Sequence, residues 1–248
     1  MITWREGVAA VALFIGAFAK GLTGIGLPSV AIPILAGLYD IRTAVILLSL
    51  PNLFTNLVLI ARGWPHIVIL RGHKGLILTG VIGVLAGVRL LCTLPQAPLS
   101  LVLGIATLAF VVNTLLNPTF RLPGRIARAL GPGVGLLAGA LQGSTGVSGP
   151  LLTMYLYSIG LPKEQFVFLI TVLFQLFSTT QFLGLLASRV YTPSIVLAAA
   201  LSGIPIALGF ALGVRFQGRI SQEAFNRFIL VLLTFIALRL ISTSLRGL

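Results

Sequence analysis

One lysine and two glycine-rich breaks inside apolar sequence are the residues of this chain that could bind a ligand. Lys20 directly precedes the stretch Gly21-Leu-Thr-Gly-Ile-Gly-Leu-Pro28, and Gln142 directly precedes the similar stretch Gly143-Ser-Thr-Gly-Val-Ser-Gly-Pro150. Lys20 is the one full charge that flanks either break. A fixed positive charge beside hydroxyl groups and free backbone N–H groups is chemistry that binds an oxyanion. The two breaks therefore predict an anion-binding site.

The expected donors come from both breaks and from the helices beside them. A hydroxyl group or a side-chain amide can donate a hydrogen bond to an anion, and a glycine lets the backbone approach it closely. The alternative is that Lys20 snorkels to the membrane interface from a differently placed helix. The predicted binding residues are Lys20, Gly21, Thr23, Gly24, Gly26, Asn52, Gln142, Gly143, Thr145, Gly146, Ser148 and Gln175.

The breaks belong to a longer internal duplication. The first break aligns with the second at an offset of 122 residues, and Asn52-Leu-Phe-Thr aligns with Gln175-Leu-Phe-Ser. Further on, Gly83-Val-Leu-Ala-Gly-Val-Arg89 aligns with Gly209-Phe-Ala-Leu-Gly-Val-Arg215. The matches keep their order, which indicates two copies of one unit. We expect the first repeat over 1–117, a connecting loop over 118–132 and the second repeat over 133–248.

A second polar pair follows from the same alignment, because Asn113 falls opposite Arg239. Both lie within apolar stretches, where polar side chains bridge helices or line a pathway. Both readings stay open for this pair. Two further spacings, Gly83 with Gly87 and Gly209 with Gly213, predict close packing of helices through small residues.

Composition places these residues in a membrane protein. Of the 248 residues, 57% are hydrophobic and 8% are charged, and the mean hydropathy is +1.10. We expect an all-α polytopic integral membrane protein with two homologous halves of four apolar segments each. The first segment of each half, roughly residues 7–38 and 130–159, is too long for one simple crossing, which needs about 20 residues. These are the two segments that contain the breaks, and each is either interrupted or re-entrant.

Charge counting compares the two topologies. If all eight segments cross the membrane, the two sides carry nine and six basic residues; if both broken segments turn back as re-entrant hairpins, the side opposite the termini carries ten and the other side five. The second split agrees better with the excess of Lys and Arg in cytoplasmic loops. It makes the two halves antiparallel, so an inverted repeat is favoured, by a margin of one residue.

Several classes of function are unfavourable for this sequence. Glu6, Asp40, Glu164 and Glu223, the four acids, all lie at segment ends, so no carboxylate is placed for a proton relay or a metal cation. Cys92 is the single cysteine. No cofactor or metal is expected, and no nucleophile with a base indicates an integral-membrane enzyme. The net charge of +13 comes mainly from residues between apolar spans, which indicates topology and contact with anionic membrane lipid rather than nucleic acid.

Both breaks carry a resemblance to a known family. The Gly21-Leu-Thr-Gly-Ile-Gly stretch with Pro33, and the stretch from Gly143 to Leu156 that leads into Gly160-Leu-Pro-Lys-Glu-Gln-Phe166, resemble the TauE/SafE-type sulfite exporters, also called the 4-toluenesulfonate uptake permease family. The resemblance covers nearly the whole chain. It implies a multi-pass carrier of the inner (plasma) membrane for sulfite, sulfonates and other small organic or sulfur-containing anions. Leu27 and Pro28 stand where many relatives continue a glycine run, which leaves the substrate open.

The function expected is therefore transport of a small oxyanion, bound near the bilayer midplane at the N-termini of broken helices. Without a carboxylate relay, the membrane potential is a sufficient driving force, since export of a monoanion from a negative interior gains about 2.3 kcal/mol per 100 mV. An anion channel would use the same positive site and remains the alternative. The direction of transport and the oligomeric state stay open.

Overall fold

The computed structural model describes residues 4–23, 26–116, 121, 123–216 and 222–246. Within these ranges the chain is helical and contains no strand. The elements are α1 (Trp4–Thr23), α2 (Leu27–Leu38), α3 (Ile41–Gly63), the 3₁₀ helix η1 (Trp64–His73), α4 (Lys74–Thr93), α5 (Gln96–Leu116), α6 (Gly124–Thr145), α7 (Gly149–Ser158), α8 (Lys163–Ala187), α9 (Pro193–Arg215) and α10 (Gln222–Arg246).

Long apolar helices confirm the expected class of a helical membrane protein. Among the described residues, four helical stretches are long and apolar enough to cross a bilayer: Ile67–Thr93, Gln96–Asn113, Glu164–Ala187 and Pro193–Arg215. Shorter apolar helices lie at Leu27–Leu38 and Ile41–Leu57. A helix satisfies its own backbone hydrogen bonds, which hydrocarbon requires of any spanning segment.

Each glycine-rich break reverses the chain. A Cβ on Gly16 of α1 would lie 3.0 Å from the carbonyl oxygen of Leu27 and 3.4 Å from the Cβ of Ala31, so α2 returns alongside α1. In the second half, the hydroxyl of Tyr155 on α7 donates a 2.9 Å hydrogen bond to the carbonyl oxygen of Ala127, near the start of α6. The two broken segments are therefore helical hairpins. Pro28 and Pro150 stand in the first turns of α2 and α7, where the missing N–H costs no helical hydrogen bond.

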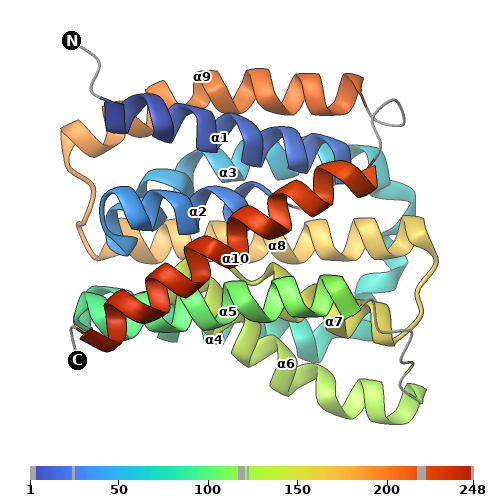
Figure 1. Cartoon of the computed structure of the whole chain (residues 1–248). Coiled ribbons are helices and arrows are strands. Elements are labelled where there is room, and N and C mark those ends of the chain that lie inside the picture. The colour runs from blue at the N-terminus through green and yellow to red at the C-terminus, as the bar shows by residue number, and fades with distance from the viewer. Residues whose placement is uncertain (1–3, 24–25, 117–120, 122, 217–221, 247–248) are drawn as a thin grey trace.

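Glycines bring helices of the two halves into close contact. A Cβ on Gly87 of α4 would lie 2.8 Å from the Cα of Gly143 on α6, and a Cβ on Gly213 of α9 would lie 3.0 Å from the Cα of Gly21 on α1. These contacts confirm the close packing expected of Gly83 with Gly87 and of Gly209 with Gly213. The contact of α4 with α6 thus has its equivalent in the contact of α9 with α1. Helices α9 and α1 are seen side by side at the top of Figure 1.

The contacts also give the relative directions of neighbouring helices. Successive glycines of α9 meet successive turns of α1, from Phe14 to Phe18, so these helices are parallel, and the same holds for α4 with α6. Arg42 at the start of α3 donates hydrogen bonds of 2.9 Å to the carbonyl oxygens of Leu91 and Leu94 at the end of α4, so α3 and α4 are antiparallel. As Figure 1 shows, α1 and α3 point the same way, so α1 runs opposite to α6.

Helix ends gather at two ends of the molecule. In Figure 1, α3, α5, α7 and α9 finish at the right, and α2, α4, α8 and α10 finish at the left, where α1 begins. Short connections then join neighbouring helices at each end.

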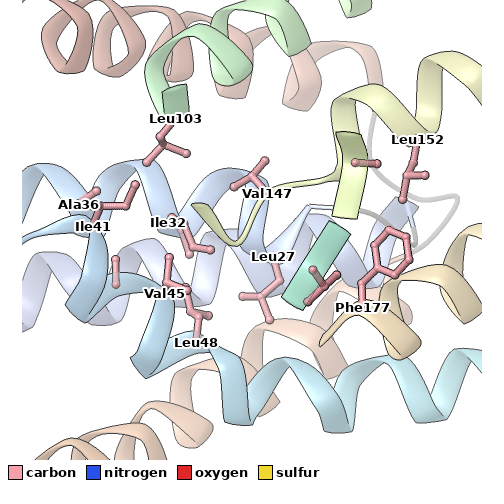
Figure 2. Close-up of a cluster of buried hydrophobic side chains, with 14 of the residues drawn as sticks. Leu27, Ile32, Ala36, Ile41, Val45, Leu48, Leu103, Val147, Leu152 and Phe177 are labelled. Atoms are coloured by element: carbon pink, nitrogen blue, oxygen red, sulfur yellow. The ribbon is translucent and has the colours of Figure 1, made fainter. Parts of the chain in front are cut away.

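The centre of the molecule is an apolar cluster around the hairpins. Leu27 at the start of α2 and Ile32 one turn later are at most 2% exposed, and Val147 in the second break is 2% exposed. Figure 2 shows Val147 beside Ile32 and Leu27, with Val45 from α3 below them. Burial of these side chains stabilises the meeting of the two breaks inside the protein.

Two boundaries differ from the sequence analysis. α6 begins at Gly124, so residues 124–132 of the expected connecting loop are helical, with Pro123 before the first turn and Pro132 inside the helix. α1 continues to Thr23, three residues beyond Lys20. Arg125 and Arg128 are exposed on the first turns of α6. Charged residues of this kind are found at the ends of membrane helices as well as in loops, so they did not distinguish the two.

Candidate functional site

The two breaks meet at one small cavity. Its walls come from the end of α1, the start of α2, the middle of α3, the end of α6, the start of α7 and the middle of α8. The free space inside is close to that needed by a single water molecule. The lining residues are Lys20, Gly26, Pro28, Ser29, Asn52, Gln142, Gly146, Val147, Ser148, Gly149 and Phe174.

Lys20 is buried in this cavity and held by oxygens of α3. It is 2% exposed, so the alternative that it snorkels to the interface is wrong. Its Nζ donates to Asn52 Oδ1 at 3.0 Å, to Thr55 Oγ1 at 2.8 Å and to Asn56 Oδ1. The hydroxyl of Thr55 donates to the carbonyl oxygen of Asn52 at 3.0 Å, which leaves its oxygen as an acceptor for Lys20. Three acceptors match the three protons of an ammonium group.

None of the three groups that hold Lys20 is charged. Asn52 also donates from Nδ2 to the Ser178 hydroxyl on α8 at 2.8 Å, whereas the Nδ2 of Asn56 is buried and has no hydrogen-bond partner among the described residues. Within the described lining of the cavity no side chain is acidic. The hydrogen-bonding capacity of Lys20 is satisfied, and its positive charge is not neutralised.

A neutral network occupies the same place in the second half. Gln142 Nε2 donates to Gln181 Oε1 of α8 at 3.0 Å, and the Ser148 hydroxyl donates to Gln142 Oε1 at 2.8 Å. Gln181 in turn donates to the carbonyl oxygen of Gln142 at 2.6 Å. In both halves the last turn before the break is therefore bonded to the helix that follows the hairpin. Only the first half places a cation there.

The N-termini of α2 and α7 open at the cavity without a side-chain cap. Gly26, at the N-cap of α2, has a φ of 144° and no side chain with which to cap this helix. Ser148 is the N-cap residue of α7, but its hydroxyl bonds to Gln142 instead of capping the helix. Each terminus contributes a partial positive charge of about half a unit. Both partial charges add to that of Lys20.

Four predicted binding residues, Gly21, Gly143, Thr145 and Gln175, are not among the residues that line the cavity. Gly21 and Gly143 are the close-contact positions against α9 and α4. The Thr145 hydroxyl donates to the carbonyl oxygen of Leu141 in its own helix at 2.7 Å. Gln175 donates to Thr179 at 3.2 Å along α8, and its Oε1 is buried without a partner among the described residues. Gly24 and the side chain of Thr23 lie outside the described residues.

Asn113 and Arg239 lie at different levels of the molecule. In the antiparallel pair α5–α10, Gly104 faces Ala237 and Ile241, so Arg239 lies about two and a half turns along the axis from the level of Asn113. Arg239 is exposed, and a Cβ on Gly37 of α2 would be 3.7 Å from its Nη1. The structure therefore does not bring this pair together.

Sequence reasoning missed Thr55, Asn56, Gln181 and Ser29. A signal was present for the first two, since residues three and four positions after Asn52 share its face of a helix. Ser29 lies one residue after Pro28, within the first turn of α2. Gln181 gave no such signal, because the alignment of the halves pointed to Gln175 instead.

Comparison with known proteins gives a family for this arrangement. The family model of the sulfite exporter TauE/SafE matches residues 8–240, a range that contains both hairpins and every described residue of the cavity. No curated protein and no solved structure matches the chain. The match extends over nearly the whole sequence, so this chain belongs to the TauE/SafE sulfite exporter family of membrane transporters.

Proposed function

We propose that this protein transports a small organic or sulfur-containing oxyanion, such as sulfite or a sulfonate, by binding it in the cavity between the two breaks. The observation that carries the proposal is Lys20, a buried ammonium group whose three hydrogen-bond acceptors are all neutral. Taking an ion out of water costs several kcal/mol unless a partner compensates it. A bound anion supplies that compensation.

The donors around the cavity fit an oxyanion. Lys20, the amide of Gln142 and the hydroxyls of Ser148 and Ser29 line the cavity. The protons of Lys20, Gln142 and Ser148 are donated to protein acceptors in this closed arrangement, and they would turn to the anion when it binds. The uncapped N-termini of α2 and α7 offer backbone N–H groups, which bind phosphate-like and sulfate-like groups in many proteins. Because the free space is so small, the hairpins must separate before an anion enters.

We also propose that the two halves form an inverted repeat. α1 runs opposite to α6, and each half packs its fourth α-helix, α4 or α9, against the first helix of the other half. An axis relating two such units would lie in the membrane plane and pass near the cavity, as in other transporters with broken helices. If the two halves exchanged their conformations, the cavity would open first to one side of the membrane and then to the other.

The distribution of basic residues orients the molecule. Nine of the described ones lie toward the end where α3, α5, α7 and α9 finish: Arg62, Arg71, Lys74, Arg121, Arg125, Arg128, Lys163, Arg215 and Arg227. By the positive-inside rule this end faces the cytoplasm of a cell whose inner (plasma) membrane holds the protein. The start of α1 and the end of α10 then face outward. Export of an anion down the membrane potential needs no further coupling ion.

Flux measurements on Lys20→Met test the proposed function. We expect proteoliposomes with the unaltered protein to take up methanesulfonate or sulfite with saturable counterflow, and Lys20→Met to lose at least tenfold in apparent affinity. Lys74→Met is the matched control, since Lys74 is exposed at the start of α4 and far along the chain from either break. Unchanged transport in Lys20→Met removes the site, and single-channel conductance without counterflow assigns a channel.

A further inference from the structure

We infer that the site selects oxyanions with a single negative charge, such as hydrogensulfite or an organic sulfonate, and rejects dianions such as sulfate. The inference rests on the proposed function, since it names the charge state of the anion that the same cavity takes. It follows from the charges that surround the cavity and from the way Lys20 is held.

The described lining of the cavity carries one full charge. Of the described residues that line the cavity, Lys20 is the one ionisable side chain. The remaining polar groups are the amides of Asn52 and Gln142 and the hydroxyls of Ser29 and Ser148. A monoanion beside Lys20 forms a neutral pair. A dianion leaves one negative charge that faces only the partial charges at the N-termini of α2 and α7, which act through backbone N–H groups and are not equivalent to a second full charge.

Apolar side chains surround the place where the second charge of a dianion would lie. The lining also includes Val147 and Phe174, and apolar side chains such as Leu27 and Ile32 pack directly behind the breaks. Figure 2 shows this apolar surround at the meeting of the hairpins. The cost of transferring an ion from water into such a region rises with the square of its charge, so a dianion is penalised far more than a monoanion.

The two halves differ in charge at equivalent positions next to the breaks. Gln142 occupies the position in the second half that Lys20 occupies in the first, before the break and bonded to the following long helix. A second lysine there would have made a doubly positive cavity suited to a dianion. The amide of Gln142 instead offers hydrogen bonds without charge: its N–H groups suit an oxygen of a sulfonate, and its carbonyl oxygen suits the hydroxyl of hydrogensulfite.

Binding of methanesulfonate and sulfate to the unaltered protein tests the inference. Both ligands are sulfur oxyanions of similar size, and they differ in charge. We expect titration calorimetry in detergent to give at least tenfold tighter binding of methanesulfonate than of sulfate, with both weakened in Lys20→Met. Equal or tighter binding of sulfate overturns the inference.

A charge placed in the second half provides an independent test. In Gln142→Lys we expect sulfate affinity to rise at least tenfold relative to methanesulfonate. Gln96→Lys, at the exposed start of α5, adds the same charge away from the cavity and should leave the ratio unchanged. Size-exclusion and thermal unfolding establish that each variant is folded. A folded Gln142→Lys protein with an unchanged ratio contradicts the inference.

The outcomes separate the inference from the proposed function. If neither anion binds the unaltered protein, or if Lys20→Met leaves binding of both unchanged, the proposed function fails. If both anions bind equally and both lose affinity in Lys20→Met, the site stands and its charge selectivity is refuted.

Discussion

At the residue scale, the central feature is an ammonium group held by amide and hydroxyl oxygens. Asn56 contributes one of these oxygens and is fully buried, and the Nδ2 of the same amide has no partner among the described residues. An amide at this position keeps Lys20 in place without cancelling its charge. We therefore expect Asn56 to position Lys20 and to preserve its attraction for the proposed anion.

The substitution Asn56→Asp should abolish anion binding while leaving Lys20 unchanged. The new carboxylate would lie within hydrogen-bonding distance of Nζ, pair with it and neutralise the cavity. We expect methanesulfonate affinity to fall at least tenfold in titration calorimetry, and the protein to remain folded because the pair is complete. Asn113→Asp is the control, since it introduces the same charge on α5 outside the cavity. Equal affinity in Asn56→Asp and the unaltered protein would show that Lys20 does not attract the ligand through its charge.

At the scale of the elements, the hairpins are anchored by helices from the opposite half. Gly213 of α9 and Gly21 of α1 allow these helices to touch backbone to backbone, and Gly87 and Gly143 do the same for α4 and α6. Close approach at these positions holds each break at the level of the cavity. We therefore expect the glycines next to the site residues to support the site through helix packing.

Gly213→Ala should lower the free energy of unfolding. Its Cβ would clash with the carbonyl oxygen of Phe18, which is backbone and cannot move aside. Overpacking of this kind costs about 1–3 kcal/mol. Gly203→Ala on the same helix is the control, because nothing lies within 4 Å of its added Cβ, and its higher helix propensity should be neutral or stabilising. Thermal unfolding in detergent measures both, and similar midpoints would contradict the packing argument.

The elements also show what could be predicted from the sequence. Both breaks, their equivalence and the glycine contacts were predictable, because a glycine or proline inside an apolar run has few structural explanations. The reversal of the chain at each break was suggested only by charge counting. The contacts that hold the site were harder to predict. The alignment of the two halves predicted Gln175 as a site residue, whereas Gln181 is the residue that contacts Gln142. Side-chain contacts depend on how far each helix is rotated and shifted, and the alignment does not give this.

At the scale of the whole molecule, the helix directions favour the hairpin topology that we propose over eight full crossings. With hairpins, the helices before and after each break enter and leave at the same end, and the halves are inverted. With eight full crossings, residues of η1 and of the α8–α9 connection would lie on one side of the membrane. In the arrangement of Figure 1 they lie at opposite ends of the molecule.

Labelling of single cysteines tests this arrangement in the membrane. Cys92 is first replaced by serine, and Gly72→Cys in η1 or Ser188→Cys at the end of α8 is then introduced; both positions are exposed. We expect a membrane-impermeant maleimide to label Ser188→Cys in intact cells, and Gly72→Cys only after permeabilisation, because the basic end faces the cytoplasm. The reverse pattern would keep the inverted repeat and overturn its orientation. Labelling of both positions from the same side would mean that the broken segments cross the bilayer, and the antiparallel relation of the halves would then be wrong.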